Sequence, residues 1–308
     1  MDSNDVAYFV TIKVGNPLEE FNVILDSGSS DFWVSGPSCT NSQLRTSTCF
    51  HKSLSESSTT YKPSNKPFQV TYGTGQVSGF LVQEDIEIAG LKLRSHTFGA
   101  ANQESNEFAS KKVPFDGLMG TALSSLSTSG MITPIEALAK SGKISGAFIG
   151  YALGRSEEDS NIGQVTIGGV DESKFVKPLT MIENINTRGF WEGTLNTIKV
   201  NNKVIMTSRT SIFDTGTSLI IVPRSDAEEI HGSIPGARSD GQGSFTLPCD
   251  TDVKVSLLFG GKEFVIKASD LTVQPMDLND LNGICMSGIA AGQIGGQSQW
   301  LLGDIFLK

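Results

Sequence analysis

The chain has 308 residues, of which 38% are hydrophobic and 19% charged, and its 24 basic and 33 acidic residues give a net charge of −9. This balance excludes a disordered chain and speaks against a nucleic-acid partner, which would require a basic excess. No apolar run is long enough to span a bilayer, so no membrane partner is expected. A signal peptide is not expected either, since no basic segment followed by an apolar one opens the sequence.

The first part of the sequence predicts strands that end in glycine-rich turns. Residues 8–14 and 21–25 are rich in β-branched and aromatic side chains, and the second run leads directly into Asp26-Ser27-Gly28-Ser29. Residues 68–72 and 77–82 flank Gly73-Thr74-Gly75, which predicts a hairpin with a glycine-rich tip.

Other turns and helices have their own local signals. Ala89-Gly90 and Gly260-Gly261 each predict the turn of a further hairpin. A helix is predicted to start after Thr133, with Pro134 in its first position and Glu136 completing a capping box, and to end at Gly142. A second short helix is predicted to start at Ser225.

The four cysteines, Cys39, Cys49, Cys249 and Cys285, suit two disulfides and an oxidising compartment. Three pairings are possible, and proximity in the sequence favours Cys39–Cys49 and Cys249–Cys285. Four unpaired buried thiols are the alternative. No C-x-x-C motif is present, which speaks against a zinc ribbon or a thioredoxin-type site.

The three histidines, His51, His96 and His231, are far apart and lack the spacing of metal ligands. Each is expected at the surface. We therefore expect no metal and no cofactor. The small number of histidines also speaks against a catalytic mechanism that depends on histidine.

An internal repeat is the strongest sign of organisation. Residues 23–30 (VILDSGSS) resemble residues 211–218 (SIFDTGTS), and at nearly the same distance beyond each aspartate follow Leu118-Met119-Gly120 and Leu301-Leu302-Gly303. Two features that recur in the same order predict two duplicated lobes. We expect the first lobe to span residues 1–170 and the second to span residues 171–308.

Each repeated turn can present a carboxylate. A strand delivers the aspartate to a turn that glycine allows to be tight, and neighbouring hydroxyls can donate to the carboxylate. If the lobes face each other, Asp26 and Asp214 meet, and two adjacent carboxylates share one proton. Such a pair can deprotonate a water molecule and protonate a carbonyl or a leaving amine, which suits amide hydrolysis.

With these motifs the sequence resembles the pepsin-family aspartic endopeptidases, of the fungal type, over nearly its whole length. The segments that carry the resemblance are residues 26–34, 72–75, 115–120, 214–218 and 300–304. The resemblance implies an all-β, bilobal fold of two related barrel-like lobes, with few short helices and a cleft between the lobes. It also implies an endopeptidase that works at acid pH through an aspartate dyad and prefers large hydrophobic residues around the cut bond.

The resemblance implies roles for particular residues. Asp26 and Asp214 match the catalytic aspartates, Tyr72 matches a tyrosine that closes over the substrate on a flap, and Trp33 is similar to the tryptophan that supports it. The other substrate-binding residues that it implies are Gly73, Thr74, Gly28, Gly216, Ser29, Thr217, Ile24, Phe108 and Ile212. Core packing is the alternative for the last three.

The sequence also departs from the family. Asp31 stands where members commonly have asparagine, and we expect it at the surface. Asp116 and Asp304 are interpreted as structural. Members continue beyond the segment that matches residues 300–306, so the last strands of the second lobe are expected to be missing, and the lack of a basic prosegment suggests the mature part of a zymogen.

The family further implies a peptide or protein substrate, binding of statine-type (pepstatin-like) inhibitors, and a monomer that suffices for activity. Location in a secreted or an acidic vacuolar or lysosomal compartment is expected. The alternative function is a catalytically inactive pepsin-fold protein that binds a partner or acts as an inhibitor. Such proteins usually lose an aspartate, a turn glycine or the flap tyrosine, and this sequence keeps all of them.

Overall fold

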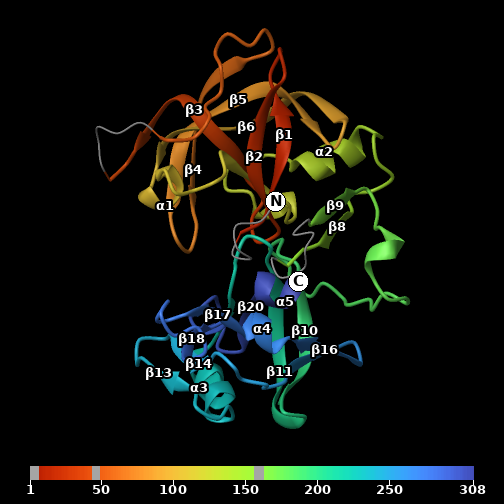
Figure 1. Ribbon diagram of the computed structural model, residues 1–308. Helices are drawn as coiled ribbons and strands as arrows, with labels where there is room; N and C mark the ends of the chain where they lie inside the picture. The colour runs from red at the N-terminus through yellow and green to blue at the C-terminus, as the bar shows by residue number, and fades with distance from the viewer. Residues whose placement is uncertain (1–6, 44–48, 156–162) are drawn as a thin grey trace. The chain divides into compact units, whose positions relative to one another are not determined.

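The computed structural model describes residues 7–43, 49–155 and 163–308. By its contacts the chain divides into two compact units, which we call unit 1 (Met1–Lys174) and unit 2 (Phe175–Lys308). Strands dominate both units (Figure 1), which confirms the predicted all-β class. Among the helices of the described residues, none combines the length and the apolar character that crossing a membrane requires.

Unit 1 is built on a ring of six strands. They pair in the order β1–β2–β7–β3–β6–β5, and β5 pairs with β1 to close the ring, while β4 extends the sheet beyond β5. The strands are β1 (Phe9–Val14), β2 (Glu19–Asp26), β3 (Phe32–Asn41), β4 (Lys62–Thr71), β5 (Gln76–Ile88), β6 (Leu91–Glu104) and β7 (Gly117–Gly120). The predicted hairpin turn at Ala89-Gly90 joins β5 to β6, and both residues have positive φ angles.

Short elements complete unit 1. They are α1 (Asn106–Ala109), the 3₁₀ helices η1 (Ser124–Leu126) and η2 (Glu172–Lys174), α2 (Pro134–Lys140), and the antiparallel pair β8 (Ile149–Ala152) and β9 (Gln164–Ile167). The start of α2 is as predicted, since the Thr133 side chain accepts a hydrogen bond of 3.2 Å from the backbone N–H of Glu136. The capping box is not completed, because the Glu136 carboxylate accepts from the backbone N–H of Ser124 at 2.9 Å instead of from that of Thr133, and so holds η1 against the helix.

Unit 2 contains two sheets. Seven strands pair in the order β16–β15–β10–β11–β20–β12–β19, and four in the order β13–β14–β18–β17. The strands are β10 (Glu192–Val200), β11 (Lys203–Phe213), β12 (Ile220–Val222), β13 (Arg238–Ser239), β14 (Phe245–Pro248), β15 (Val255–Phe259), β16 (Lys262–Ile266), β17 (Thr272–Pro275), β18 (Ile284–Ser287), β19 (Ile289–Ala291) and β20 (Gln299–Leu302). The turn at Gly260-Gly261 joins β15 to β16, as predicted.

The helices of unit 2 are α3 (Arg224–Gly232), α4 (Ala268–Leu271) and α5 (Asp304–Leu307). The predicted helix start at Ser225 is one residue late. Pro223 occupies the N-cap position and makes no side-chain capping bond, so Ser225 lies inside the first turn.

The repeat in the sequence is also a repeat in topology. In unit 1, β2 runs parallel to β7, and β7 pairs antiparallel with β3, the strand that follows the aspartate turn. In unit 2, β11 runs parallel to β20, and β20 pairs antiparallel with β12. In each unit, therefore, the aspartate turn connects two strands, and both of these strands pair with the same third strand.

The disulfides join Cys39 to Cys49 and Cys249 to Cys285, which is the pairing that proximity favours. The expectation that all histidines are exposed is wrong. His96 and His231 are buried. The His231 ring stacks on Phe245, and its two nitrogens contact the Ser287 hydroxyl at 2.8 Å and the carbonyl of Ala227 at 2.7 Å, so its polar atoms are satisfied inside the core.

Candidate active site

The carboxylate of Asp26 is held by its own turn. Asp26 is the last residue of β2 and is buried. Its Oδ1 accepts a hydrogen bond of 2.7 Å from the backbone N–H of Gly28, and its Oδ2 accepts one from the hydroxyl of Ser29. A short aspartate side chain closes such a turn readily, because it reaches the N–H two residues further on. Both carboxylate oxygens are thus oriented by the four residues of the motif.

Asp214 has the same arrangement in unit 2. It follows β11 and is also buried. Its Oδ1 accepts from the backbone N–H of Gly216 at 2.8 Å, and its Oδ2 accepts from the hydroxyl of Thr217 at 2.7 Å. The two Asp-Ser/Thr-Gly-Ser/Thr motifs therefore have the same hydrogen bonds, atom for atom, each within its own unit.

The glycine that ends each of the motifs Leu118-Met119-Gly120 and Leu301-Leu302-Gly303 packs directly against an aspartate turn. Gly120 N–H donates to the carbonyl of Asp31 at 3.0 Å, and Gly303 N–H donates to the carbonyl of Leu219 at 3.2 Å. A Cβ on Gly120 would lie 2.5 Å from backbone atoms of Ser30, and one on Gly303 would lie 2.2 Å from the carbonyl oxygen of Thr217. Only glycine allows this approach, which explains why the echoing motif ends in glycine in both units.

The glycine-rich hairpin of unit 1 carries the tyrosine. The backbone N–H of Tyr72 donates to the carbonyl of Gly75 at 2.7 Å and closes the turn, whose exposed tip is Gly73 and Thr74. The Tyr72 hydroxyl accepts a hydrogen bond of 2.8 Å from the indole N–H of Trp33. The predicted contact between the tryptophan and the tyrosine is therefore present in the structure.

The electrostatics of unit 1 connect this tyrosine to the aspartate. Burial raises the pKa of Tyr72, and the negative charge of Asp26 raises it further, against the opposite effect of hydrogen bonds from Trp33 and Ser29. The net pKa lies far above the usual value for tyrosine. The Tyr72 hydroxyl therefore keeps its proton and remains a hydrogen-bond donor as well as an acceptor.

The three predicted pocket residues are all buried. The Phe108 ring makes edge contacts with Trp33 and Tyr72, with ring centroids 5.5 and 5.4 Å apart. Ile24 belongs to the same apolar cluster, and Ile212 is among the most deeply buried side chains of the described residues. A role for these three side chains in a substrate pocket stays a prediction.

Asp31 is not at the surface, contrary to the expectation from the sequence. Its side chain is 3% exposed and accepts hydrogen bonds from Ser127, Thr128 and Ser129. Burial alone would raise the pKa of Asp31, but these bonds outweigh it and the pKa lies below the usual value. The Thr128 hydroxyl also contacts the carbonyl of Gln69 at 3.2 Å, so this loop connects the aspartate turn with β4. In the sequence, the one signal for these hydrogen-bond donors is the run of three hydroxyl side chains, Ser127-Thr128-Ser129.

Asp116 has the structural role that we expected. Its Oδ2 accepts from the backbone N–H of Asn22 at 2.8 Å, and its Oδ1 accepts from that of Lys52 at 3.0 Å. These bonds fix the chain in front of β7.

Within the described residues, the one group with the spacing of metal ligands is Cys39, Cys49 and Glu104. Its two sulfur atoms are joined in a disulfide, so neither is available as a thiolate ligand.

Two related β units that each hold an Asp-Ser/Thr-Gly turn between joined strands define a protein of the pepsin-like class. Residues 7–308 match the family described as eukaryotic aspartyl protease, and the chain belongs to this family.

Named relatives fall in the same class. The chain is 36% identical, over 100% of its length and 58% of the relative's, to a probable aspartic-type endopeptidase CTSD of Arthroderma benhamiae. It is 31% identical to rhizopuspepsin of Rhizopus chinensis, with 99% of this chain and 75% of the relative covered, and 30% identical to gastricsin of Mus musculus, with 99% and 77% covered. The chain thus spans little more than half the length of the first of these relatives.

Proposed function

We propose that this chain carries the catalytic apparatus of an aspartic endopeptidase that hydrolyses peptide bonds at acid pH. The observation that carries the proposal is the equivalence of the two aspartate turns, in which Asp26 and Asp214 each accept from an N–H and a hydroxyl of their own turn. In the proposed reaction the two aspartates share one proton and act on one water molecule. The ionised carboxylate accepts a proton from the water while the protonated one donates its proton to the carbonyl oxygen, which gives a gem-diol. As the C–N bond breaks, the first carboxyl group passes the proton it took from the water to the leaving amine, and the second carboxylate takes a proton back from the gem-diol.

We propose that the substrate is a peptide in an extended conformation, covered by the hairpin of Tyr72, Gly73 and Thr74. Since the N–H groups of Gly28 and Gly216 are directed at the aspartates, these glycines would bind the peptide through their carbonyl oxygens. Ser29 and Thr217 would keep the carboxylates oriented, and Trp33 would position Tyr72.

The specificity follows from the same residues. Ile24, Phe108 and Ile212 would favour large apolar side chains beside the cut bond. Thr74 offers no carboxylate at the hairpin tip, so a basic residue before the cut bond would be accepted poorly. A statine-type compound, which imitates the tetrahedral intermediate, should bind and inhibit, and a monomer would suffice. The two disulfides suit a secreted protein or the lumen of an acidic compartment.

The test is digestion of denatured globin at about pH 3.5, where a carboxylate pair can hold one proton. Asp26→Asn and Asp214→Asn should each lower the rate by roughly 10²–10⁴-fold, the usual contribution of a positioned proton-transfer group. Asp252→Asn, at an exposed position between β14 and β15, is the matched control and should leave the rate unchanged. Acid proteolysis that survives either active-site substitution would rule out the mechanism. A wild-type protein that binds the inhibitor but cleaves nothing would favour the inactive binding protein.

A further inference from the structure

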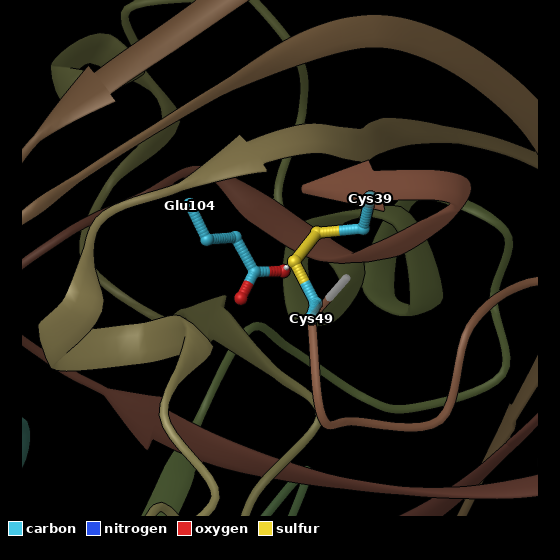
Figure 2. Close-up of side chains that lie close together, drawn as sticks. All are labelled: Cys39, Cys49 and Glu104. Carbon is cyan, nitrogen blue, oxygen red and sulfur yellow. Dashed lines mark hydrogen bonds between the residues drawn. A yellow bond between two sulfur atoms is a disulfide. The ribbon is translucent and has the colours of Figure 1, made fainter. Parts of the chain in front are cut away.

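A buried carboxylate lies against one of the two disulfides. Glu104, the last residue of β6, is 0% exposed, and its Oε1 is 3.3 Å from the Sγ of Cys39 on β3. Figure 2 shows the Glu104 side chain extending toward the Cys39–Cys49 bond. The two strands are parallel neighbours with Asn41 opposite Glu104, so the approach is fixed by the sheet.

The surroundings of Glu104 are those of a group that exchanges a proton rather than of a permanent ion pair. Oε1 accepts a hydrogen bond of 2.6 Å from the hydroxyl of Ser35, whereas Oε2 is buried without a hydrogen-bond partner. His51 Nε2 lies 3.9 Å from Oε2 and is also in contact with the carbonyl of Phe108, so it forms an ion pair with Glu104 only when the imidazole is protonated.

These surroundings hold a proton on Glu104 to unusually high pH. Burial raises the pKa of Glu104, the hydrogen bond from Ser35 opposes the rise, and the negative charge of Asp116 adds to it, which places the pKa at about 7. The carboxyl group can therefore both give and take a proton near neutral pH.

Such a group assists the opening of a buried disulfide, because it can neutralise the sulfur that leaves. Both cysteines are buried, and Cys49 is the more exposed of the two, at 9% against 4% for Cys39, which favours attack of an incoming thiolate at Cys49. The sulfur that leaves is then that of Cys39, in an apolar environment where a bare thiolate is costly. A proton delivered to the Cys39 sulfur removes that cost, and the Glu104 carboxyl is within contact distance of that sulfur.

We infer that Glu104 is the proton donor and acceptor for the opening and closing of the Cys39–Cys49 disulfide. In opening, a small thiolate attacks the Sγ of Cys49, a mixed disulfide forms, and the bond to Cys39 breaks. The Cys39 sulfur keeps the bonding electron pair and takes the proton from Glu104. A second thiolate, supplied by the same dithiol reductant, then attacks the reductant's sulfur in the mixed disulfide and releases Cys49, while the dithiol becomes a cyclic disulfide.

In closing, the steps run in reverse. The Glu104 carboxylate removes the proton from the Cys39 thiol, whose sulfur attacks the mixed disulfide at Cys49 and expels the small thiolate. Closing therefore needs an ionised Glu104 and opening needs a protonated one. In acid the attacking thiolate is scarce, so the disulfide is kinetically locked there. This inference does not depend on the proposed peptidase activity.

The test uses the second disulfide as an internal control. Folded wild-type protein is treated with dithiothreitol from about pH 5.5 to 8.5, alkylated at intervals, and the opening of both disulfides is followed by peptide mass spectrometry. The ratio of the Cys39–Cys49 rate to the Cys249–Cys285 rate cancels the thiolate concentration of the reductant. We expect this ratio to fall roughly tenfold or more as pH rises through about 7, which is a modest share of the ~10²–10⁴ that general acid catalysis can contribute.

Variants then assign the step to a residue. Glu104→Gln should make the ratio independent of pH, and Ser35→Ala should move the midpoint to higher pH, because the Ser35 hydrogen bond lowers the pKa of Glu104. In His51→Gln the rate ratio should still fall as pH rises through about 7. A constant ratio in the wild type overturns the inference even if Glu104→Gln fails to fold. The inference is also overturned if the rate ratio still depends on pH in Glu104→Gln, or if that pH dependence disappears in His51→Gln.

Discussion

The indole N–H of Trp33 donates a hydrogen bond of 2.8 Å to the phenolic oxygen of Tyr72. Trp33 lies on β3, the strand that leaves the Asp26 turn, and Tyr72 lies directly after β4, at the base of the turn that joins β4 to β5. A buried tryptophan N–H needs an acceptor, because leaving it unpaired costs ~1–3 kcal/mol. The bond therefore ties the position of the hairpin to the strand that also positions the aspartate.

This bond predicts a coupling that kinetics can measure. Trp33→Phe and Tyr72→Phe each remove one partner, and we expect each to lower kcat/KM for acid proteolysis by roughly tenfold, as the loss of one hydrogen bond of ~1–1.5 kcal/mol implies. The double variant should lose less than the product of the two factors, since the second substitution finds the bond already broken. The measurement is kcat/KM for all four proteins in a double-mutant cycle. Independent, multiplicative losses would show that the bond does not position the hairpin.

The buried carboxylate of Asp31 predicts a pH-dependent contribution to stability. In Asp31→Asn an amide group would replace one oxygen and face the N–H and hydroxyl donors of Thr128 and Ser129, so we expect a loss of ~2–3 kcal/mol in the free energy of unfolding near neutral pH. Because the pKa of Asp31 is depressed in the folded state, its stabilisation is present above the unfolded value of 3.8 and is lost as pH falls through the folded pKa.

The measurement for Asp31 is urea unfolding of wild type and Asp31→Asn at several pH values from neutral down to acid. The difference between the two proteins should narrow below the unfolded pKa. Asp252→Asn, an exposed position, serves as the control. A difference that stays constant over the whole series would mean that the negative charge of Asp31 is not what the loop recognises.

Asp31 also shows what the sequence could and could not predict. The two aspartate turns, the hairpin tip and the start of α2 were predicted because each is fixed by a few neighbouring residues, such as a glycine, a proline or a capping hydroxyl. The burial of Asp31 depends on Ser127, which lies 96 residues further along the chain. His231 is satisfied in the same way by distant Ser287. A prediction made from the typical exposure of a residue type fails wherever distant segments of the chain supply that residue's hydrogen bonds.

The close approach of Gly303 to the second aspartate turn predicts a steric effect. In Gly303→Ala the new methyl carbon would lie 2.2 Å from the carbonyl oxygen of Thr217 and 2.5 Å from that of Leu219, both backbone atoms. We expect the turn to shift and the free energy of unfolding to fall by at least ~3 kcal/mol, with loss of acid proteolysis. Gly296→Ala is the matched control in the same unit, because a Cβ there meets no atom within 4 Å. Thermal unfolding of the two variants decides, and equal stability of both would contradict the packing argument.

Glu104 predicts that unit 1 loses stability as pH rises. The pKa of Glu104 is raised from 4.5 to about 7 in the folded state, so its contribution is fully present below 4.5 and is lost as pH rises through 7. The shift corresponds to about 3 kcal/mol, since each pKa unit is worth ~1.4 kcal/mol. Glu104→Gln, which mimics the protonated form, should match wild type at about pH 4.5 and exceed it by about 3 kcal/mol at pH 8.

Hydrogen exchange of the β3 and β6 amides under increasing urea measures this difference within unit 1, whatever unit 2 does. Glu20→Gln, at an exposed position on β2, should follow the wild-type pH dependence. If Glu104→Gln loses stability in parallel with wild type between acid and neutral pH, ionisation of Glu104 does not limit the stability of this unit. A gain confined to the variant would identify the carboxyl group beside the Cys39–Cys49 disulfide as the cause, because no other titratable group is changed.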